Sequence, residues 1–168
     1  MLTEWMLAKI LKIPWSEVHE EADKIEHTIS DDVEKSLNIT LKAPDSCPHG
    51  NPMPGSDIEA ELWFPLSRCR ENDQIIIRRI HEFLEDDHKS LQFLESQDIM
   101  PGHSFSIQKI TDSKITLRLL SIGKLVSLVC AHVLNDKPTK HDMTTERIAY
   151  LRNITCFNLG EQLGLIGF

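Results

Sequence analysis

A stretch rich in proline and glycine divides this chain into two halves of different character. The fifteen residues APDSCPHGNPMPGSD, positions 43–57, contain four prolines and two glycines. Proline lacks the backbone N–H that helices and central strands need, so this stretch must be an ordered loop or a linker. Any fold of the chain therefore changes direction here.

Before this loop, the spacing of apolar residues predicts three helices. The first runs from Leu2 to Ile13 and is followed by Pro14, which cannot continue a helix. Ser16 is the expected N-cap of the second helix, whose apolar positions recur at helical spacing. Ser30, followed by two aspartates, is the expected cap of the third.

After the loop, the pattern changes to short strands. QIIIRRI, SFSIQKI, KITLRLL and KLVSLV each have strand character and are separated by polar or glycine-containing turns. One short helix is expected within DDHKSLQFLESQDIMPG, closed by a Pro-Gly turn. This pattern is typical of a small, strongly bent β-barrel with one helix.

The predicted fold class is therefore α+β, with helices first and a β-barrel second. We expect a helical domain over residues 1–56, a linker over 57–73, a β-barrel domain over 74–140 and a C-terminal extension over 141–168. A helix is expected from Thr144 to about Arg152, but the sequence indicates no role for the extension.

Composition favours a globular protein that acts in the cytoplasm. Hydrophobic residues make up 40% of the chain and charged residues 26%. The most apolar region is interrupted by Arg118 and Lys124, so no membrane span is expected, and Glu4 argues against a secretory signal. The four cysteines form no CxxC pair, and we expect reduced thiols.

The negative charge of the chain is concentrated in its first part. Residues 1–64 hold 5 Lys plus Arg against 13 Asp plus Glu, whereas residues 65–168 hold 13 of each. A DNA-binding domain needs a basic surface to meet phosphate, so this chain alone should bind nucleic acid poorly. Clustered carboxylates attract cations instead.

The decapeptide VHEEADKIEH, residues 18–27, is the predicted metal site. On a helix, His19, Asp23, Glu26 and His27 project from one side, and Glu4 could add an oxygen if the first two helices pack antiparallel. Imidazole and carboxylate suit Mn, Fe, Co, Ni or Zn. Taken alone, the decapeptide is more typical of a solvated acidic helix face than of a metal site.

Two longer stretches resemble a known family. PWSEVHEEADKIEHTISDDVEKSL and CPHGNPMPG are similar to the metal-binding and dimerisation domain of the diphtheria-toxin-repressor family of iron- and manganese-dependent regulators. LQFLESQDIMPG, placed before short strands, resembles the start of the SH3-like or FeoA-like domain of many members. The resemblance implies a non-enzymatic transcriptional regulator that forms homodimers. It would reach operator DNA through an N-terminal winged helix, which this chain does not contain, and would take no small-molecule substrate.

The same resemblance assigns the ligands to two sites. Glu4 and His19 match ligands of the family's ancillary site, and Asp23, Glu26 and His27 match ligands of its regulatory site. The histidine that pairs with the ancillary glutamate would precede Met1, and the ligands from the winged-helix domain are missing, so both sites are expected to be incomplete. The oxygen ligand at Asp23 favours Mn²⁺ or Fe²⁺ over Zn²⁺.

Cys47 and His49, within CPHGNPMP, also suggest a thiolate and imidazole pair. Because Pro48 and Pro52 explain a rigid turn at this place, we favour a structural role for both residues.

Two other functions remain open from the sequence. One is a divalent-metal enzyme that uses the same histidines and carboxylates. The other is an interaction module in which the β-barrel binds a proline-rich peptide. The chain has one Tyr and three Trp, so an aromatic peptide groove is not expected.

Overall fold

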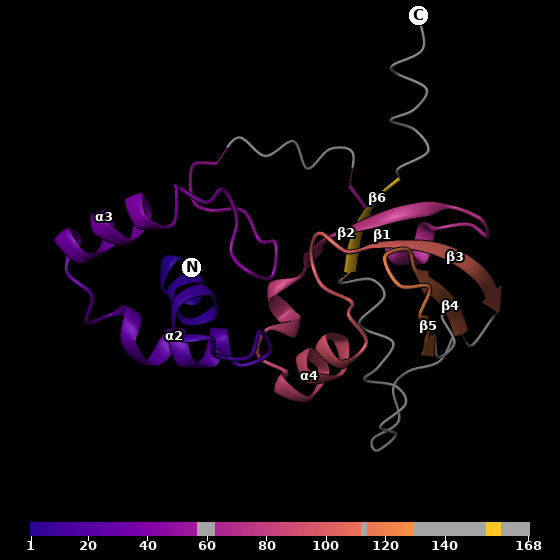
Figure 1. Ribbon diagram of the computed structural model, residues 1–168, viewed down its shortest axis with the longest axis horizontal. Helices are drawn as coiled ribbons and strands as arrows, with labels where there is room; N and C mark the ends of the chain where they lie inside the picture. The colour runs from indigo at the N-terminus through magenta and orange to yellow at the C-terminus, as the bar shows by residue number, and fades with distance from the viewer. Residues whose placement is uncertain (57–62, 112–113, 130–153, 159–168) are drawn as a thin grey trace, which may run out of the picture.

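The computed structural model describes residues 1–56, 63–111, 114–129 and 154–158. Within these ranges, the chain forms a helical part, residues 1–43, a proline-rich loop, residues 44–56, and a sheet part, which comprises the remaining described residues (Figure 1). The α+β class predicted from the sequence is confirmed. Among the described residues, no helix is long and apolar enough to cross a membrane.

The helical part contains the three expected helices with altered ends. Its elements are α1 (Leu2–Trp5), which continues as the π-helix η1 (Met6–Leu11), α2 (Val18–Glu26) and α3 (Asp31–Thr40). The first helix stops before Pro14, because Lys12 adopts a left-handed conformation with φ 60°. Ser16 does not cap α2, because the N-cap is Glu17 and the Ser16 hydroxyl donates to Glu95. Ser30 is the N-cap of α3, as predicted.

The sheet part is a six-stranded antiparallel sheet in the order β1-β6-β2-β3-β4-β5. Its strands are β1 (Phe64–Pro65), β2 (Gln74–Ile80), β3 (Ser104–Thr111), β4 (Lys114–Leu119), β5 (Leu125–Val129) and β6 (Ile154–Asn158). Between them lie the short 3-10 helices η3 (Leu66–Arg68) and η4 (Glu82–Leu84) and the helix α4 (His88–Ser96). The four expected strands and the expected helix are thus confirmed.

Two pieces of the sheet lie outside the segment in which strands were expected. β1 and the fully buried Leu66 fall in the expected linker, and β6 falls in the expected C-terminal extension. β6 pairs with both β1 and β2, so it connects segments far apart in sequence. Pairing between such distant segments cannot be predicted from the local spacing of apolar residues. The helix expected at Thr144–Arg152 lies outside the described residues.

Most of the buried apolar surface belongs to the sheet part. Ile75, Ile77 and Ile80 of β2 are fully buried, and α4 adds Leu91 and Leu94 to the same core. The register of β2 shifts between Ile77 and Arg79, and such an irregularity bends a strand. A smaller core in the helical part contains Leu7, Val18 and Ala22.

The proline-rich loop, residues 44–56, joins the two parts through backbone hydrogen bonds. From the helical part, Trp5 Nε1 donates to the Ser46 carbonyl at 2.6 Å, and Trp15 Nε1 donates to the Pro48 carbonyl at 2.8 Å. From the sheet part, the Ile80 N–H donates to the His49 carbonyl at 2.8 Å. The segment predicted to be an ordered loop or a linker is therefore an ordered loop that contacts both parts of the molecule.

Gly50 allows this loop to lie directly on β2. Its φ is +85°, and a Cβ added there would come within 2.0 Å of the Arg78 carbonyl oxygen. Gly55 has a similar φ of +79°, but an added Cβ would meet no atom of the described residues within 4 Å. The two glycines therefore share a backbone conformation and differ in the space around them.

We expect Gly50→Ala to lower the free energy of unfolding by at least about 3 kcal/mol, since backbone strain and steric overlap add together. Gly55→Ala should cost about 1–2 kcal/mol, from strain alone. Urea unfolding of the two variants beside the wild type would measure both. Equal losses would show that the loop does not press on β2 at Gly50.

Candidate metal centre

Four buried side chains gather where the loop meets both parts of the molecule. They are Glu4 from α1, Cys47 and His49 from the loop, and Glu85, which directly follows η4. One ligand atom from each lies within 4.8 Å of the others. We call these four residues the buried cluster. They come from three separate segments, so only the folded chain brings them together.

Two atoms of the buried cluster point at the same small space. Glu4 Oε2 and His49 Nδ1 are buried and, among the described residues, accept or donate no hydrogen bond. His49 Nδ1 lies 3.8 Å from Glu4 Oε2 and 3.8 Å from Glu85 Oε2. Buried polar atoms without partners are costly, and a cation bound between them would satisfy both.

Asn51 holds the fourth member in place. Its side-chain amide donates to Glu85 Oε1 and to the Ile80 carbonyl, the latter at 2.9 Å. Glu85 is 5% exposed and so is almost wholly withdrawn from water. One of its oxygens is thus fixed by Asn51, and the other faces the cluster.

His19 lies beside the buried cluster and bridges its two carboxylates. Its Nδ1 is 2.8 Å from Glu85 Oε2 and 3.4 Å from Glu4 Oε1. Hydrogen bonds to Glu4 and Glu85 raise the pKa of His19 to about 10 against the opposing effect of burial. Burial raises the pKa of Glu4, but the hydrogen bond from His19 and the nearby His49 ring outweigh it and bring the pKa to about 2. Without a metal ion, the imidazolium of His19 supplies the cation that two buried carboxylates require.

Burial raises the pKa of the Cys47 thiol to about 12, and the nearby charges of Glu4 and Glu85 raise it further. Cys47 is therefore a neutral thiol in the metal-free protein. A thiol becomes a thiolate when a metal ion displaces its proton, so metal binding here would release a proton.

The donor set of the buried cluster fits a divalent transition metal. One sulfur, one imidazole nitrogen and two carboxylates are the ligand types found around zinc, iron and cobalt, and the carboxylates also suit manganese. The free lone pairs on Glu4 and His49 give the site two ready donors.

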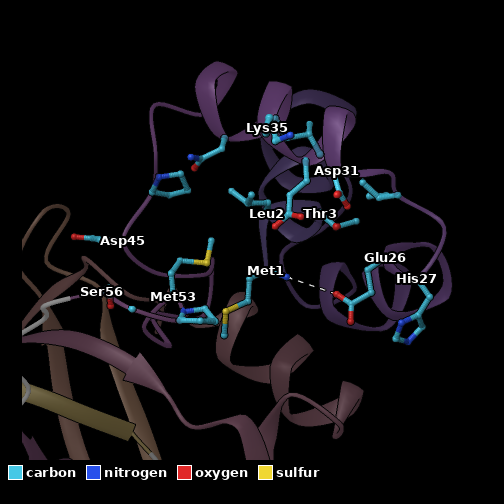
Figure 2. Close-up of a pocket in the computed structure, with 17 residues that line it drawn as sticks. Met1, Leu2, Thr3, Glu26, His27, Asp31, Lys35, Asp45, Met53 and Ser56 are labelled. Carbon is cyan, nitrogen blue, oxygen red and sulfur yellow. Dashed lines mark ion pairs between the residues drawn. The ribbon is translucent and has the colours of Figure 1, made fainter.

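A second group of ligands lies on the surface. Asp23, Glu26 and His27 offer ligand atoms within 4.8 Å of one another, and all three are exposed. We call them the exposed triad. Glu26 and His27 line a groove of about 940 Å³ between α1, α3 and the loop, shown in Figure 2. The amino group of Met1 lies 3.7 Å from Glu26 Oε2 in this groove.

The five ligands expected from the sequence thus divide between two places. Glu4 and His19 lie at the buried cluster, and the other three form the exposed triad. His19 and His27 share a helix side but are about 12 Å apart along the helix axis, too far for one ion. Glu85 was not among the residues predicted from the sequence, and Cys47 and His49 were predicted to have a structural role. Their C-x-H spacing in one loop was the available signal.

Comparison with known proteins places the helical part in a family. Residues 1–55 match the family model described as iron dependent repressor, metal binding and dimerisation domain. The chain is 46% identical over 127 residues to the iron-dependent repressor IdeR of Mycobacterium bovis. This chain belongs to the iron-dependent repressor family. The match to IdeR covers 69% of this chain and 55% of IdeR, so the chain spans about half the length of that relative.

Solved structures with the same fold include a manganese-dependent transcriptional repressor, with a TM-score of 0.73 and 24% identity. The match covers 94% of this chain and 76% of that one. A manganese-dependent transcriptional repressor in complex with manganese matches with a TM-score of 0.72 and 25% identity, over 94% of this chain and 67% of that one. The similarity extends across both parts of the molecule.

The pairing of His19 with the carboxylates makes a testable prediction for protein kept metal-free with a chelator. The folded pKa of His19 is about 10 against 6.5 unperturbed, so its contribution to stability is complete below pH 6.5 and is lost as pH rises through 10. For Glu4, with a folded pKa of about 2 against 4.5, the contribution is complete above pH 4.5 and is lost as pH falls through 2.

The free energy of unfolding should therefore decline between about pH 6.5 and about pH 10, and His19→Gln should weaken this decline. Urea unfolding at several pH values, with Glu21→Gln on the exposed face of α2 as the control, would measure it. A decline of the same size in His19→Gln would contradict the pairing.

Proposed function

We propose that this chain is the metal-sensing and dimerisation part of a metal-dependent transcriptional regulator that responds to Mn²⁺ or Fe²⁺. The buried cluster is the observation that carries this proposal, because the helical part, the loop and the sheet part each contribute ligands to it. Similar proteins are named iron-dependent and manganese-dependent repressors, which supports a metal-dependent regulator. DNA recognition belongs to a part of such regulators that this chain does not span.

The buried cluster couples metal binding to the arrangement of the two parts. Glu4 belongs to the helical part, and Glu85 belongs to the sheet part. A bound cation supplies the positive charge that draws the two carboxylates together. A ligand shifts a conformational equilibrium only by binding one state more tightly, and a site shared between two parts meets that condition. A bound metal ion therefore favours the arrangement in which the helical part and the sheet part lie against each other at the buried cluster.

We assign the exposed triad as the second, responsive site. Asp23, Glu26 and His27 leave one side open to solvent, so three protein ligands would need completion from another segment or from water. The groove beside them offers space for such a segment (Figure 2). A metal ion bound at this site would then hold the segment of the regulator that lies in the groove.

The remaining properties follow from the same proposal. A homodimer is expected from the helical part, and Ile10 and Leu11, 51% and 58% exposed, supply apolar surface for it. Operator DNA would be reached through a winged helix outside this chain, since the helical part is acidic. The regulator would act in the cytoplasm and catalyse no reaction.

A metal-dependent enzyme is the weaker candidate. Catalysis at a metal needs an open coordination position next to a substrate cavity. All four residues of the buried cluster are buried, and Glu26 and His27 of the exposed triad line a groove open to solvent. The cavity of about 280 Å³ lined by His19, Asp23 and Glu85 is smaller than most ligand pockets.

Equilibrium dialysis of Mn²⁺, Fe²⁺ and Zn²⁺ against the purified chain tests the proposal. We expect saturable binding, lowered at least about tenfold by Glu85→Gln and, at a second and weaker site, by His27→Ala. Glu21→Gln is the matched control, because Glu21 lies on α2 but belongs to neither site. Sedimentation equilibrium on the same samples should show a dimer. A monomer that binds no metal, or binding that neither variant changes, would overturn the proposed function.

A further inference from the structure

A carboxylate of the sheet part holds the turn that precedes α2. Glu95, on α4, accepts the Trp15 N–H on Oε1 at 2.9 Å. Its Oε2 accepts the Ser16 hydroxyl at 2.7 Å and the Ser16 N–H at 3.3 Å. Hydrogen bonds to an ionised acceptor are roughly twice as strong as neutral ones. The turn before α2 is thus anchored to a helix of the other part.

The peptide group between Trp15 and Ser16 links Glu95 to the metal centre. Its N–H, on Ser16, donates to Glu95, and its carbonyl, on Trp15, lies 3.2 Å from His49 Nε2. The peptide group is planar, so fixing its N–H also fixes the direction of its carbonyl. Hydrogen bonds in series polarise one another, so the bond to Glu95 makes the Trp15 carbonyl a better acceptor.

This carbonyl determines which nitrogen of His49 carries the proton. A carbonyl only accepts hydrogen bonds, so His49 Nε2 must be the protonated nitrogen that donates to it. In the neutral imidazole, Nδ1 is then left with a free lone pair, and it is the atom that faces Glu4 and Glu85. His49 is fully buried, so water does not compete for either nitrogen. Metal-binding histidines commonly donate their other N–H to a carbonyl or carboxylate in this way.

The His49 ring is also held by contacts that do not set its proton. The Trp15 ring lies against it with centroids 4.5 Å apart, and the His49 carbonyl accepts the Ile80 N–H at 2.8 Å. These contacts fix the position of the ring. The hydrogen bond to the Trp15 carbonyl involves a ring nitrogen directly and so favours the tautomer protonated on Nε2.

We propose that Glu95 is a positioning residue for the metal centre: through the Trp15–Ser16 peptide, it holds His49 in the tautomer whose Nδ1 can bind a metal ion. This inference rests on the proposed function and goes beyond it, because among the described residues Glu95 forms no hydrogen bond or ion pair with a member of the buried cluster. It gives the sheet part a second route, besides Glu85, by which its position controls the metal site.

Two measurements on the full chain test this role. Long-range ¹H–¹⁵N NMR correlation of the histidine rings in metal-free protein reports the tautomer of His49, assigned with His49→Gln. Competition with a chelator gives the Zn²⁺ affinity. The variants are Glu95→Ala, Glu95→Gln, which keeps one acceptor oxygen, and Ser16→Ala, which keeps the carboxylate. Asp73→Asn is the matched control, because Asp73 accepts the Arg70 N–H at 2.7 Å within the sheet part.

We expect wild-type His49 to be protonated on Nε2 and Glu95→Ala to give a mixture of tautomers. Zn²⁺ affinity should fall about 10- to 100-fold in Glu95→Ala and less in Glu95→Gln and Ser16→Ala. Asp73→Asn should change neither quantity. An unchanged tautomer in both Glu95 variants, or an equal loss of affinity in Asp73→Asn, would overturn the inference. If the wild type binds none of Mn²⁺, Fe²⁺ and Zn²⁺, the proposed function fails, yet the tautomer comparison still decides the role of Glu95.

Discussion

Two buried carboxylates, one from each part of the molecule, impose the constraint on which the structure depends. Glu4 and Glu85 are 4% and 5% exposed, and both face the same space. Like charges withdrawn from water repel strongly unless a cation lies between them. Protonated His19 provides one such cation, and a divalent metal would provide a stronger one. The contact between helices and sheet therefore depends on which cation occupies this place.

The loop of residues 44–56 converts this electrostatic requirement into a defined geometry. It carries Cys47 and His49, and its backbone is tied to the helical part through two tryptophans and to the sheet part through Ile80. Gly50 permits the close approach to β2 that places His49 correctly. Glu95 then fixes the orientation of the Trp15–Ser16 peptide, whose carbonyl faces the His49 ring. The metal ligands are thus supported by neighbours that have no metal-binding chemistry of their own.

Local features of the sequence predicted most helices and strands, but they could not predict contacts between residues far apart in the chain. Strand β2 is continuous in the sequence as QIIIRRI, and its isoleucines predict a strand; the alternation of its burial breaks where the register shifts between Ile77 and Arg79. The side chain of Ser16 has the chemistry of a helix cap, but a carboxylate 79 positions away takes its hydroxyl instead. Glu85 is one acid among several in its segment, and only the fold brings it to Glu4. Cys47 and His49 were visible in the sequence, but the prolines around them gave a sufficient structural explanation.

The most direct test of the account is X-ray absorption at the zinc edge on protein loaded with one equivalent of Zn²⁺. If Zn²⁺ binds at the buried cluster, the ion should have one sulfur neighbour at about 2.3 Å, from Cys47, together with nitrogen and oxygen neighbours at about 2.0–2.2 Å. Loss of the sulfur in Cys47→Ser, with the ion retained, would identify the buried cluster as the site filled first. A first shell of nitrogen and oxygen alone in the wild type would place the ion elsewhere and contradict the central claim.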